Sequence, residues 1–260
     1  MKPHLISVCV VVTFLLVLWF MWRFLWGDAP RSLSIVIARY REDLSWMNGL
    51  HRHIRFFLYL KGPDLTDAER EALPPHVCIF RLPNVGRCDH TFLYHIVTQF
   101  HTLSEVTVFV SGDGGDARKG PKIQQVITLA AKTMDTVLSG QRMHSVRDDV
   151  GAFELDDWTS SSAVNQQGEG ALSTLLPAPI RPFNAWYDAQ FPELQNTRIQ
   201  VVCWGSNFAV HRRHIQQHPI QRYQNILSQL EVYSNPEVGH YVERSWAAIF
   251  WPYPLRCVYD

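Results

Sequence analysis

The sequence lacks the short motifs that mark many nucleotide-dependent and hydrolytic enzymes. It has no G-x-G-x-x-G after its first predicted strand, no G-x-x-x-x-G-K-[ST] phosphate loop, no G-x-S-x-G nucleophile turn and no H-E-x-x-H zinc motif. Each of these motifs serves a defined chemistry. Their absence therefore argues against dinucleotide oxidoreductases, P-loop enzymes, common hydrolases and zinc proteases.

The chain also lacks an excess of charge of either sign, because 24 basic residues balance 24 acidic ones. Since there is no basic field, nucleic acid is not an expected partner. An apolar content of 47% argues against disorder. At 260 residues the chain has room for one domain after its N-terminal segment, and a domain of that size buries a full core without disulfides.

Cysteine is sparse and follows no pattern. Of the five cysteines, Cys9 lies in an apolar N-terminal segment, and Cys78, Cys88, Cys203 and Cys257 are dispersed. There is no C-x-x-C pair and no zinc-ligand spacing. Two disulfides and four buried thiols both agree with this pattern, so cysteine leaves the cellular compartment open. The lack of an N-x-[ST] glycosylation site leaves it open too.

The longest uncharged apolar run lies near the N-terminus. Leu5–Trp22 holds 18 residues without a charge, and as a helix it would extend roughly 27 Å, which suits a thin bilayer. Trp19, Trp22 and Trp26 fit an interfacial aromatic belt, and Arg23 can reach the same interface. A cleaved secretory signal would need a shorter apolar stretch and an A-x-A site. We therefore predict a signal-anchor helix at residues 1–26, in membrane lipid, and a linker at 27–33.

The flanking basic residues do not fix the orientation of this helix. Lys2 precedes it, whereas Arg23, Arg31, Arg39 and Arg41 follow it. Because basic residues gather on the cytoplasmic side of a membrane, this count alone would place the domain in the cytosol. Arg39 and Arg41 fall inside the predicted domain, which weakens their weight, so the orientation stays open.

Residues 34–260 have the pattern of a single α/β domain. In the first part of the domain, apolar runs typical of buried strands alternate with segments of helical spacing, which predicts a mostly parallel sheet with flanking helices. The expected strands are 34–40, 54–60, 77–81 and 106–110, and the helices between them begin at Asp43, at the capping box Thr66–Glu69 and at Asp89.

The alternation ends after residue 110. A strand-like segment at Ile199–Val210 is interrupted by Trp204-Gly-Ser-Asn, and a long loop without periodicity covers Asp156–Pro182. Helices are expected at Lys122–Met134, at Arg181–Tyr187, at Arg212–Glu231 with a break at Pro219, and at Val238–Phe250.

The strongest candidate for chemistry is Asp113-Gly-Gly-Asp116, which directly follows a strand predicted to be central. Ligands of open α/β sheets bind outside the carboxyl ends of the strands. Carboxylates suit Mg²⁺ or Mn²⁺, which clamp phosphates, and the glycines would let a diphosphate approach the backbone. The same residues are also common in a solvated Gly-Asp turn, so both interpretations remain.

Two other segments and three aromatic residues also have two interpretations each. Leu82–Asp89 joins a strand to a helix, where backbone amides suit an anion, but an ordinary turn has the same composition. Glu243, on the last predicted helix, is either a general base near a pocket or half of a surface Glu-Arg pair. Three aromatic residues either stack on a sugar ring or pack in the core: Trp186, Tyr187 and Trp204.

Three of these segments resemble inverting glycosyltransferases of the GT-A fold. Ile35–Trp46, which contains Tyr40-Arg-Glu42, is similar to the opening strand of those enzymes, often V-V-x-x-Y-N-E. Leu82–Gly86 is similar to their N-x-G segment. Phe109–Asp116 falls where they carry a D-x-D metal motif, although the two carboxylates here are three positions apart instead of two.

A closer resemblance is to a family of mostly fungal and protist proteins to which no reaction is assigned. Six motifs in the same order carry this resemblance, and together they span roughly the whole domain. They are A-R-Y-x-E-D-L-x-W at Ala38–Trp46, L-P-N-x-G-R at Leu82–Arg87, T-V-F-x-x-G-D at Thr107–Asp113, R-P-F-x-x-W-Y at Arg181–Tyr187, W-G-x-x-F-A-V at Trp204–Val210 and E-R-x-W-x-x-I-F at Glu243–Phe250.

The resemblance to GT-A enzymes implies a GT-A-like fold and a site. Asp113 and Asp116 would hold Mn²⁺ or Mg²⁺, and Glu243 would be the catalytic base that deprotonates an acceptor hydroxyl. A glycan or other hydroxylated acceptor would contact Trp186, Tyr187 and Trp204. The nucleotide-sugar donor would contact Arg39, Tyr40, Glu42, Asn84, Gly86 and Asp113.

The resulting hypothesis is a membrane-anchored, metal-dependent glycosyltransferase of the endoplasmic reticulum or Golgi, with its domain in the lumen. A non-catalytic binding or scaffold protein on a degenerate GT-A-like domain would have a similar sequence. A third hypothesis is a membrane-bound, metal-dependent hydrolase that uses Asp113 and Asp116.

Overall fold

A computed structural model describes residues 32–50, 54–142, 151–155, 176–194 and 201–259. The chain divides into two units, Met1–Ser32 and Leu33–Asp260, and all described residues after Ser32 belong to the second. No helix among the described residues is long and apolar enough to cross a membrane. The predicted anchor at residues 1–26 lies outside them, as does most of the predicted loop at 156–182.

Five strands form the central sheet, in the order β3-β2-β1-β4-β8. They are β1 Leu33–Arg39, β2 Arg55–Leu60, β3 Val77–Arg81, β4 Val106–Ser111 and β8 Phe208–His211. The first four are parallel and β8 is antiparallel to β4, which confirms the predicted α/β fold with a mostly parallel sheet. The chain proceeds outward from β1 to β3 and then returns to the other side of β1 as β4. The strand order therefore reverses between β1 and β4.

Helices and short strands complete the domain. The α-helices are α2 Asp67–Glu71, α3 Arg87–Thr98, α4 Gly120–Thr133, α5 Phe183–Gln190, α6 Arg212–Gln216, α7 Ile220–Leu227 and α8 Glu237–Ile249. The 3₁₀ helices are η1 Ser45–Gly49, η2 Asp113–Gly115, η5 Pro192–Leu194, η6 Ser228–Leu230 and η7 Leu255–Cys257. Two small sheets pair β5 Leu138–Ser139 with β9 Val258–Tyr259, and β6 Gln141–Arg142 with β7 Val201–Val202.

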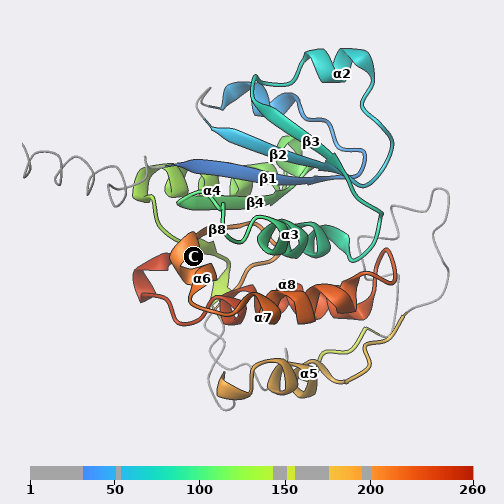
Figure 1. The fold of residues 1–260 in the computed structure, drawn as a ribbon, viewed down its shortest axis with the longest axis vertical. Helices are drawn as coiled ribbons and strands as arrows, with labels where there is room; N and C mark the ends of the chain where they lie inside the picture. Colours follow the sequence, from blue (N-terminus) through green and yellow to red (C-terminus); the bar gives the residue numbers. More distant parts are fainter. Residues whose placement is uncertain (1–31, 51–53, 143–150, 156–175, 195–200, 260) are drawn as a thin grey trace, which may run out of the picture. The chain divides into compact units, whose positions relative to one another are not determined.

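The sheet separates two hydrophobic layers, because successive side chains of a strand point to opposite faces. Val36 and Phe109 join the layer that contains α3, α7 and α8, whereas Ile35 and Val108 join the layer that contains α4 (Figure 1). Beyond α8, the helix α5 packs through Trp186. As a result, α8 is buried along its whole length, and Arg244 is its one residue with intermediate exposure.

Several predicted helix starts and breaks are confirmed. Thr66 and Glu69 make both hydrogen bonds of the capping box at the start of α2. Pro219 separates α6 from α7, as its missing N–H requires. The interruption before β8 is present too, because Trp204–Asn207 forms a turn between β7 and β8.

Two predicted helix caps are wrong. Asp43 accepts a hydrogen bond from the backbone N of Ser45 at 3.0 Å, and only the 3₁₀ helix η1 follows, so Asp43 closes a local turn instead of starting an α-helix. Helix α3 begins at Arg87, two residues before Asp89, because Gly86 in a left-handed conformation is its N-cap. Asp89 is therefore inside the helix, where it is completely buried.

Gly86 requires glycine for two reasons. Its φ is +58°, in the left-handed region that glycine adopts readily. A Cβ at this position would lie 2.6 Å from the backbone oxygen of Leu230. The Gly86 N–H donates to the backbone oxygen of Tyr233 at 2.6 Å, so this turn joins the start of α3 to the segment before α8.

We predict that Gly86→Ala lowers the free energy of unfolding by about 1–3 kcal/mol, because alanine is strained in the left-handed conformation and meets Leu230. Urea unfolding of the full chain measures the change. Gly49→Ala is the matched control, since a Cβ there meets nothing within 4 Å, and it should change stability by less than about 0.5 kcal/mol. Equal losses in the two variants would contradict the prediction.

Candidate functional site

The carboxyl ends of β1 and β4 open into a small cavity of about 110 Å³, which we call the strand-end pocket. Arg39 and Tyr40 line it at the end of β1, and Ser111 and Asp113 line it at the end of β4. Its other walls come from the loops after β2 and β3, the start of α3 and the segments before β8 and α8. In open α/β sheets, the point where the strand order reverses is where ligands bind.

A larger cavity of about 510 Å³ adjoins this pocket. Arg87, Lys119 and Gly205 line both, so the two cavities are neighbouring compartments of one site. The larger volume is within the ~300–1,000 Å³ typical of small-molecule sites. We call it the basic cavity, because its described wall carries five cationic side chains and one carboxylate: Arg87, Arg118, Lys119, Lys122, Arg244 and Glu243.

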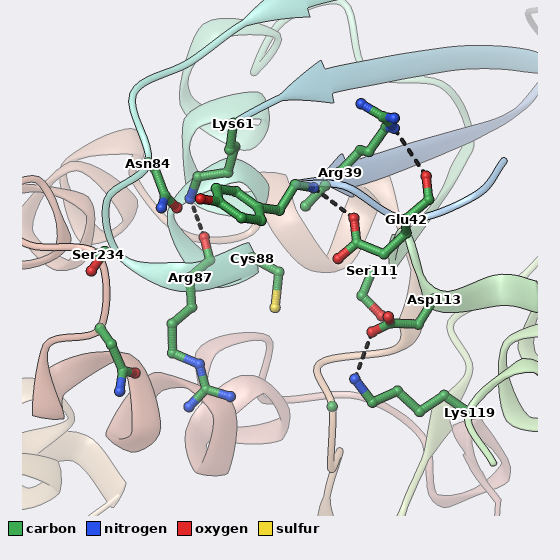
Figure 2. Close-up of a pocket in the computed structure, with 14 residues that line it drawn as sticks. Arg39, Glu42, Lys61, Asn84, Arg87, Cys88, Ser111, Asp113, Lys119 and Ser234 are labelled. Atoms are coloured by element: carbon green, nitrogen blue, oxygen red, sulfur yellow. Dashed lines mark hydrogen bonds and ion pairs between the residues drawn. The ribbon is translucent and has the colours of Figure 1, made fainter. Parts of the chain in front are cut away.

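Most of the residues predicted to bind a donor lie together in the strand-end pocket. The structure brings five of the six there from three segments of the chain: Arg39, Tyr40, Glu42, Asn84 and Asp113. Four of them are labelled in Figure 2, namely Arg39, Glu42, Asn84 and Asp113. The sixth, Gly86, is not among the lining residues and holds the neighbouring turn instead. The pocket therefore unites side chains that are more than seventy positions apart in the sequence.

Two of these five, Arg39 and Glu42, shape the wall of the pocket. The Arg39 guanidinium donates to the backbone oxygens of Glu42 and Pro63 at 3.0 and 3.2 Å and forms an ion pair with Glu69 at 2.9 Å. Glu42 Oε2 accepts a hydrogen bond from the Tyr40 backbone N at 2.6 Å. Because these contacts fix the chain after β1, both side chains have a structural role in the pocket.

The two carboxylates predicted to bind a metal are directed to different partners. Asp113 lines the strand-end pocket, with Oδ2 at 2.5 Å from Lys119 Nζ. Asp116 is exposed, and its Oδ1 accepts from the backbone N of Arg118 and of Lys119 at 2.9 and 2.8 Å. In the part of the chain that the structure describes, no three His, Cys, Asp or Glu side chains are grouped to hold a metal. Asp113 and Asp116 thus do not fit a shared metal ion.

The glycines between these carboxylates allow close packing. A Cβ on Gly114 would lie 2.3 Å from the Trp46 ring, and Trp46 Nε1 donates to the Gly112 backbone oxygen at 3.1 Å. Gly114 is buried under this ring. The expectation that a diphosphate approaches the backbone here is therefore wrong for Gly114.

Arg87 connects the two cavities through its contacts with α8. Its Nη1 lies 2.7 Å from His240 Nδ1 and 3.7 Å from Glu243 Oε2. Burial, followed by the charges of Arg87 and Arg244, lowers the pKa of His240 to about 2, so the ring is neutral. Since a guanidinium only donates, Nδ1 accepts from Arg87 and the Nε2 proton is directed to Asn235 Oδ1 at 3.0 Å.

Glu243 lies in the wall of the basic cavity, with only 8% of its surface exposed. Its Oε1 accepts a hydrogen bond from the Gly205 backbone N at 2.7 Å, and its Oε2 is the atom near Arg87. Burial separates it from the surface Glu-Arg pair that the sequence allowed. A carboxylate beside a cavity has the placement that a general base requires.

The Arg244 guanidinium is held beside two aromatic rings. Its Cζ lies 3.6 Å from the centroid of the Phe153 ring and 4.9 Å from that of Trp204, and its Nη1 donates to the His240 backbone oxygen at 2.9 Å. Burial lowers the pKa of Arg244 to about 10, which leaves it charged at neutral pH. Trp204, expected to stack on a sugar, is thus a cation–π partner in the cavity wall.

The other two aromatic residues expected to bind an acceptor are in the core. Trp186 is fully buried, donates from Nε1 to Gln229 Oε1 at 2.8 Å and packs 5.7 Å from Tyr241 between ring centroids. Tyr187 is 5% exposed and packs 5.0 Å from Phe191. Neither lines the strand-end pocket or the basic cavity. The core-packing interpretation holds for both.

Lys61 lines the strand-end pocket and supports the loop between β3 and α3. Its side chain is 7% exposed, and its Nζ donates to the backbone oxygens of Val85 and Arg87. Burial lowers its pKa to about 8. Arg87 itself has a φ of +56°, which is unfavourable for a residue with a side chain. Strained backbone of this kind persists where surrounding contacts over-determine it.

Asp89 is the buried acid of the same region. Its Oδ1 accepts from Ser206 Oγ at 2.6 Å and from Trp246 Nε1 at 2.8 Å, and none of its surface is exposed. Burial raises its pKa to about 6, against the opposing effect of Arg87. This carboxylate therefore joins α3 to α8 and to the turn before β8.

Apart from Arg39, the sequence predictions did not include the cations that line the two cavities. Lys61, Lys119 and Lys122 stand in no motif of their own, and Arg87 and Arg244 were treated as neighbours of Asn84 and Glu243. A usable signal was present, because L-P-N-x-G-R and E-R-x-W each contain an arginine. The four described cysteines, which the sequence left undecided, are free thiols in the structure.

The raised pKa of Asp89 predicts a pH dependence of stability. A carboxyl group whose folded pKa exceeds its unfolded value contributes stability that is complete below pH ~4 and is lost as the pH rises through about 6. We expect wild type to lose about 2–3 kcal/mol relative to Asp89→Asn between pH 4 and pH 7.5. Asparagine keeps the acceptor oxygen but cannot ionise. Urea unfolding of both chains across this range tests the prediction, and parallel pH profiles would contradict it.

Two solved structures are similar to parts of the chain. The crystal structure of S. aureus TarS 1-349 matches with a TM-score of 0.33 and 11% identity, over 76% of this chain and 54% of that chain. The galactosyltransferase LgtC, in complex with donor and acceptor sugar analogs, matches with a TM-score of 0.33 and 9% identity, over 82% of this chain and 71% of that chain. The chain thus spans about half the length of the TarS chain.

At the level of sequence, a family model matches nearly the whole domain. It covers residues 35–259 and is described as "Protein of unknown function (DUF3431)". A search of the curated proteins found no match.

Proposed function

We propose that this chain, which belongs to the DUF3431 family, binds a nucleotide-sugar donor at the ends of β1 and β4 and transfers the sugar to an acceptor hydroxyl. The observation that carries the proposal is that the residues assigned to the donor by resemblance to GT-A enzymes meet in one pocket. That pocket also lies where the strand order reverses, which is the expected ligand position in an open α/β sheet.

The basic cavity supports the same assignment through its charge. A nucleotide sugar carries its negative charge on a diphosphate, and guanidinium and ammonium groups are the usual protein partners of phosphate. Arg87 and Lys119 belong to both compartments, so a ligand that extends from one to the other passes them. We therefore assign the diphosphate to this boundary.

Glu243 has a defined part in the proposed transfer. The acceptor oxygen forms a bond to the anomeric carbon of the donor sugar while the bond from that carbon to the diphosphate oxygen breaks. The acceptor proton passes to Glu243, and the nucleoside diphosphate leaves with the electron pair of the broken bond. Cations beside the diphosphate stabilise the charge that develops on this leaving group.

We predict that a nucleoside diphosphate raises the unfolding temperature of the full chain in detergent. A ligand at about 100 times its Kd adds about 2.7 kcal/mol, which corresponds to roughly 5–10 °C here. UDP and GDP would be compared, with and without Mn²⁺. Asn84→Ala, in the pocket, should reduce the shift by at least about half because it removes a polar contact. Asn48→Ala, an exposed asparagine in η1, should retain it. The lack of a shift with any nucleotide would contradict donor binding.

We further predict that Glu243→Gln retains the nucleotide-induced shift but reduces turnover by about 10²–10⁴-fold, because a glutamine cannot take a proton. The glutamine amide of this variant still offers an oxygen to the Gly205 N–H, so the local structure is preserved. Release of nucleoside diphosphate from a panel of nucleotide sugars measures turnover. Glu231→Gln, at an exposed glutamate before α8, is the control. Unchanged turnover in Glu243→Gln would remove Glu243 from the reaction.

A second candidate function is donor binding without transfer. It is favoured by the contacts of Glu243, whose Oε1 is occupied by the Gly205 N–H while its Oε2 is near Arg87. A carboxylate whose oxygens are engaged in this way offers fewer free lone pairs to an acceptor hydroxyl. This candidate predicts a nucleotide-induced shift in the wild type together with no release of nucleoside diphosphate from any nucleotide sugar.

We also propose that residues 1–26 anchor the domain to a membrane of the endoplasmic reticulum or Golgi, with the domain in the lumen. The uncharged run Leu5–Trp22 and its tryptophans are the basis of this proposal. Protease treatment of sealed microsomes tests it. Digestion of the domain without added detergent would contradict a luminal location.

A further inference from the structure

The residues expected to bind a metal in this site are paired with groups of the protein itself. The nearest charged group to the Asp113 carboxylate is Lys119 Nζ, at 2.5 Å. Asp116 is turned toward the backbone at the start of α4 and is absent from the walls of both cavities. A divalent cation that holds a diphosphate is usually bound through one or two carboxylates together with the phosphates. The two carboxylates of the strand-end pocket are already engaged, because Asp113 is paired with Lys119 and Glu42 Oε2 accepts from the backbone N of Tyr40 and of Arg41.

Cations of the protein converge on the place where a diphosphate would lie. Arg87 and Lys119 line both cavities, and Figure 2 shows them on different segments, α3 and the loop before α4. Lys122 and Arg244 line the basic cavity beyond them, and Arg118 stands at its exposed rim. Since His240 is neutral and Glu243 is the one carboxylate in the described wall, the wall carries an excess of four positive charges.

These cations are held in position by contacts within the protein. Lys122 Nζ donates to the Trp204 backbone oxygen at 3.1 Å, and Arg244 is fixed by Phe153 and by the His240 backbone oxygen. Burial lowers the pKa of Lys122, which shows that its ammonium group is partly removed from water. Groups that are already placed and partly desolvated bind an anion with little further ordering cost.

Two buried polar atoms at this site have no partner in the described part of the chain. They are Arg244 Nε, in the wall of the basic cavity, and Ser111 Oγ, in the strand-end pocket. A buried donor left without an acceptor costs about 1–3 kcal/mol, and such atoms call for an explanation. An anion in the basic cavity would supply an acceptor to Arg244, and a polar group in the strand-end pocket would supply one to Ser111.

From these observations we infer that the chain holds a diphosphate without a metal ion, by means of Arg87, Lys119, Lys122 and Arg244. The inference rests on the proposed donor site and specifies how that site neutralises the charge of its ligand. Lysine and arginine take the part that Mn²⁺ or Mg²⁺ was expected to take. Asp113 then keeps Lys119 in place and accepts hydrogen bonds from uncharged groups of the ligand.

Inorganic pyrophosphate tests the inference directly. Its binding to the full chain in detergent would be measured by calorimetry, in EDTA and separately with Mn²⁺. We expect binding in EDTA, with a Kd that changes by less than about threefold when Mn²⁺ replaces EDTA. We also expect it to weaken as salt is added, because salt screens charge-charge attraction.

A matched pair of lysines on α4 locates the site. Lys122→Gln should weaken pyrophosphate binding by about tenfold or more, because it removes a charge-assisted contact. Lys132→Gln, at an exposed lysine in the last turn of the same helix, should leave binding unchanged. Arg118→Gln provides a second variant at an exposed position of the cavity wall, and urea unfolding confirms that each variant is folded.

Asp113→Asn distinguishes a diphosphate held by the protein's cations from one held through a metal ion at Asp113. If the cations hold the diphosphate, this change removes a nearby negative charge, and pyrophosphate should bind equally well or more tightly in EDTA. If Asp113 holds a metal, wild type should bind only with Mn²⁺, and the variant should lose that binding. This second result, or a lack of pyrophosphate binding in all conditions, would overturn the inference.

The same binding measurements test the proposed function separately from the metal-free site. Metal-free binding of pyrophosphate that no nucleotide sugar displaces would support the anion site and contradict the donor assignment. Nucleotide-sugar binding that requires Mn²⁺ would support the donor assignment and contradict the metal-free site.

Discussion

The site depends on one carboxylate that has no contact with solvent. Asp89 Oδ1 accepts hydrogen bonds from Ser206 and Trp246, so a single oxygen joins α3, the turn before β8 and α8. A buried charge is tolerated only where hydrogen bonds compensate it, which makes these two contacts specific. The turn that they hold presents the Gly205 N–H to Glu243, so the position of the candidate base follows from the position of Asp89.

The reversal of strand order explains why the site is at this edge of the sheet. Parallel strands β1 and β4 end side by side, and the chain continues from them into η1 and η2. Lys61 lines the pocket at these strand ends, and its contacts hold the loop that leads into α3. Buried lysine and strained backbone are unfavourable by themselves, and their combination at one place is typical of a binding site.

The sequence predicted those parts of the structure that local patterns determine. Continuous apolar runs identified β1, β2 and β4, because strands covered on both faces have no polar side, and a shorter run identified β3, which is largely exposed. Asp89 was misread because aspartate is a frequent N-cap, and the left-handed Gly86 that starts α3 earlier has no local marker. The place of Arg87 was not predicted because its partner His240 is 153 positions away in the sequence. Trp186 was ambiguous, since aromatic residues serve cores and sugar sites equally well.

The distribution of charge in the site also restricts what the ligand can be. Asp113 and Glu42 offer acceptors in the strand-end pocket, where Arg39 and Lys61 already donate to backbone oxygens, so this pocket can accept hydrogen bonds from hydroxyl or amide groups of a ligand. The basic cavity favours phosphate for the opposite reason. Lys119 lies between them and is shared, because Asp113 holds it at 2.5 Å while it also faces the basic cavity. A phosphate at the boundary of the two compartments would lie beside Arg87 and Lys119, with Lys122 and Arg244 further along the basic cavity. The proposed nucleotide-sugar donor agrees with this arrangement, because it carries hydroxyl-rich groups on either side of a diphosphate.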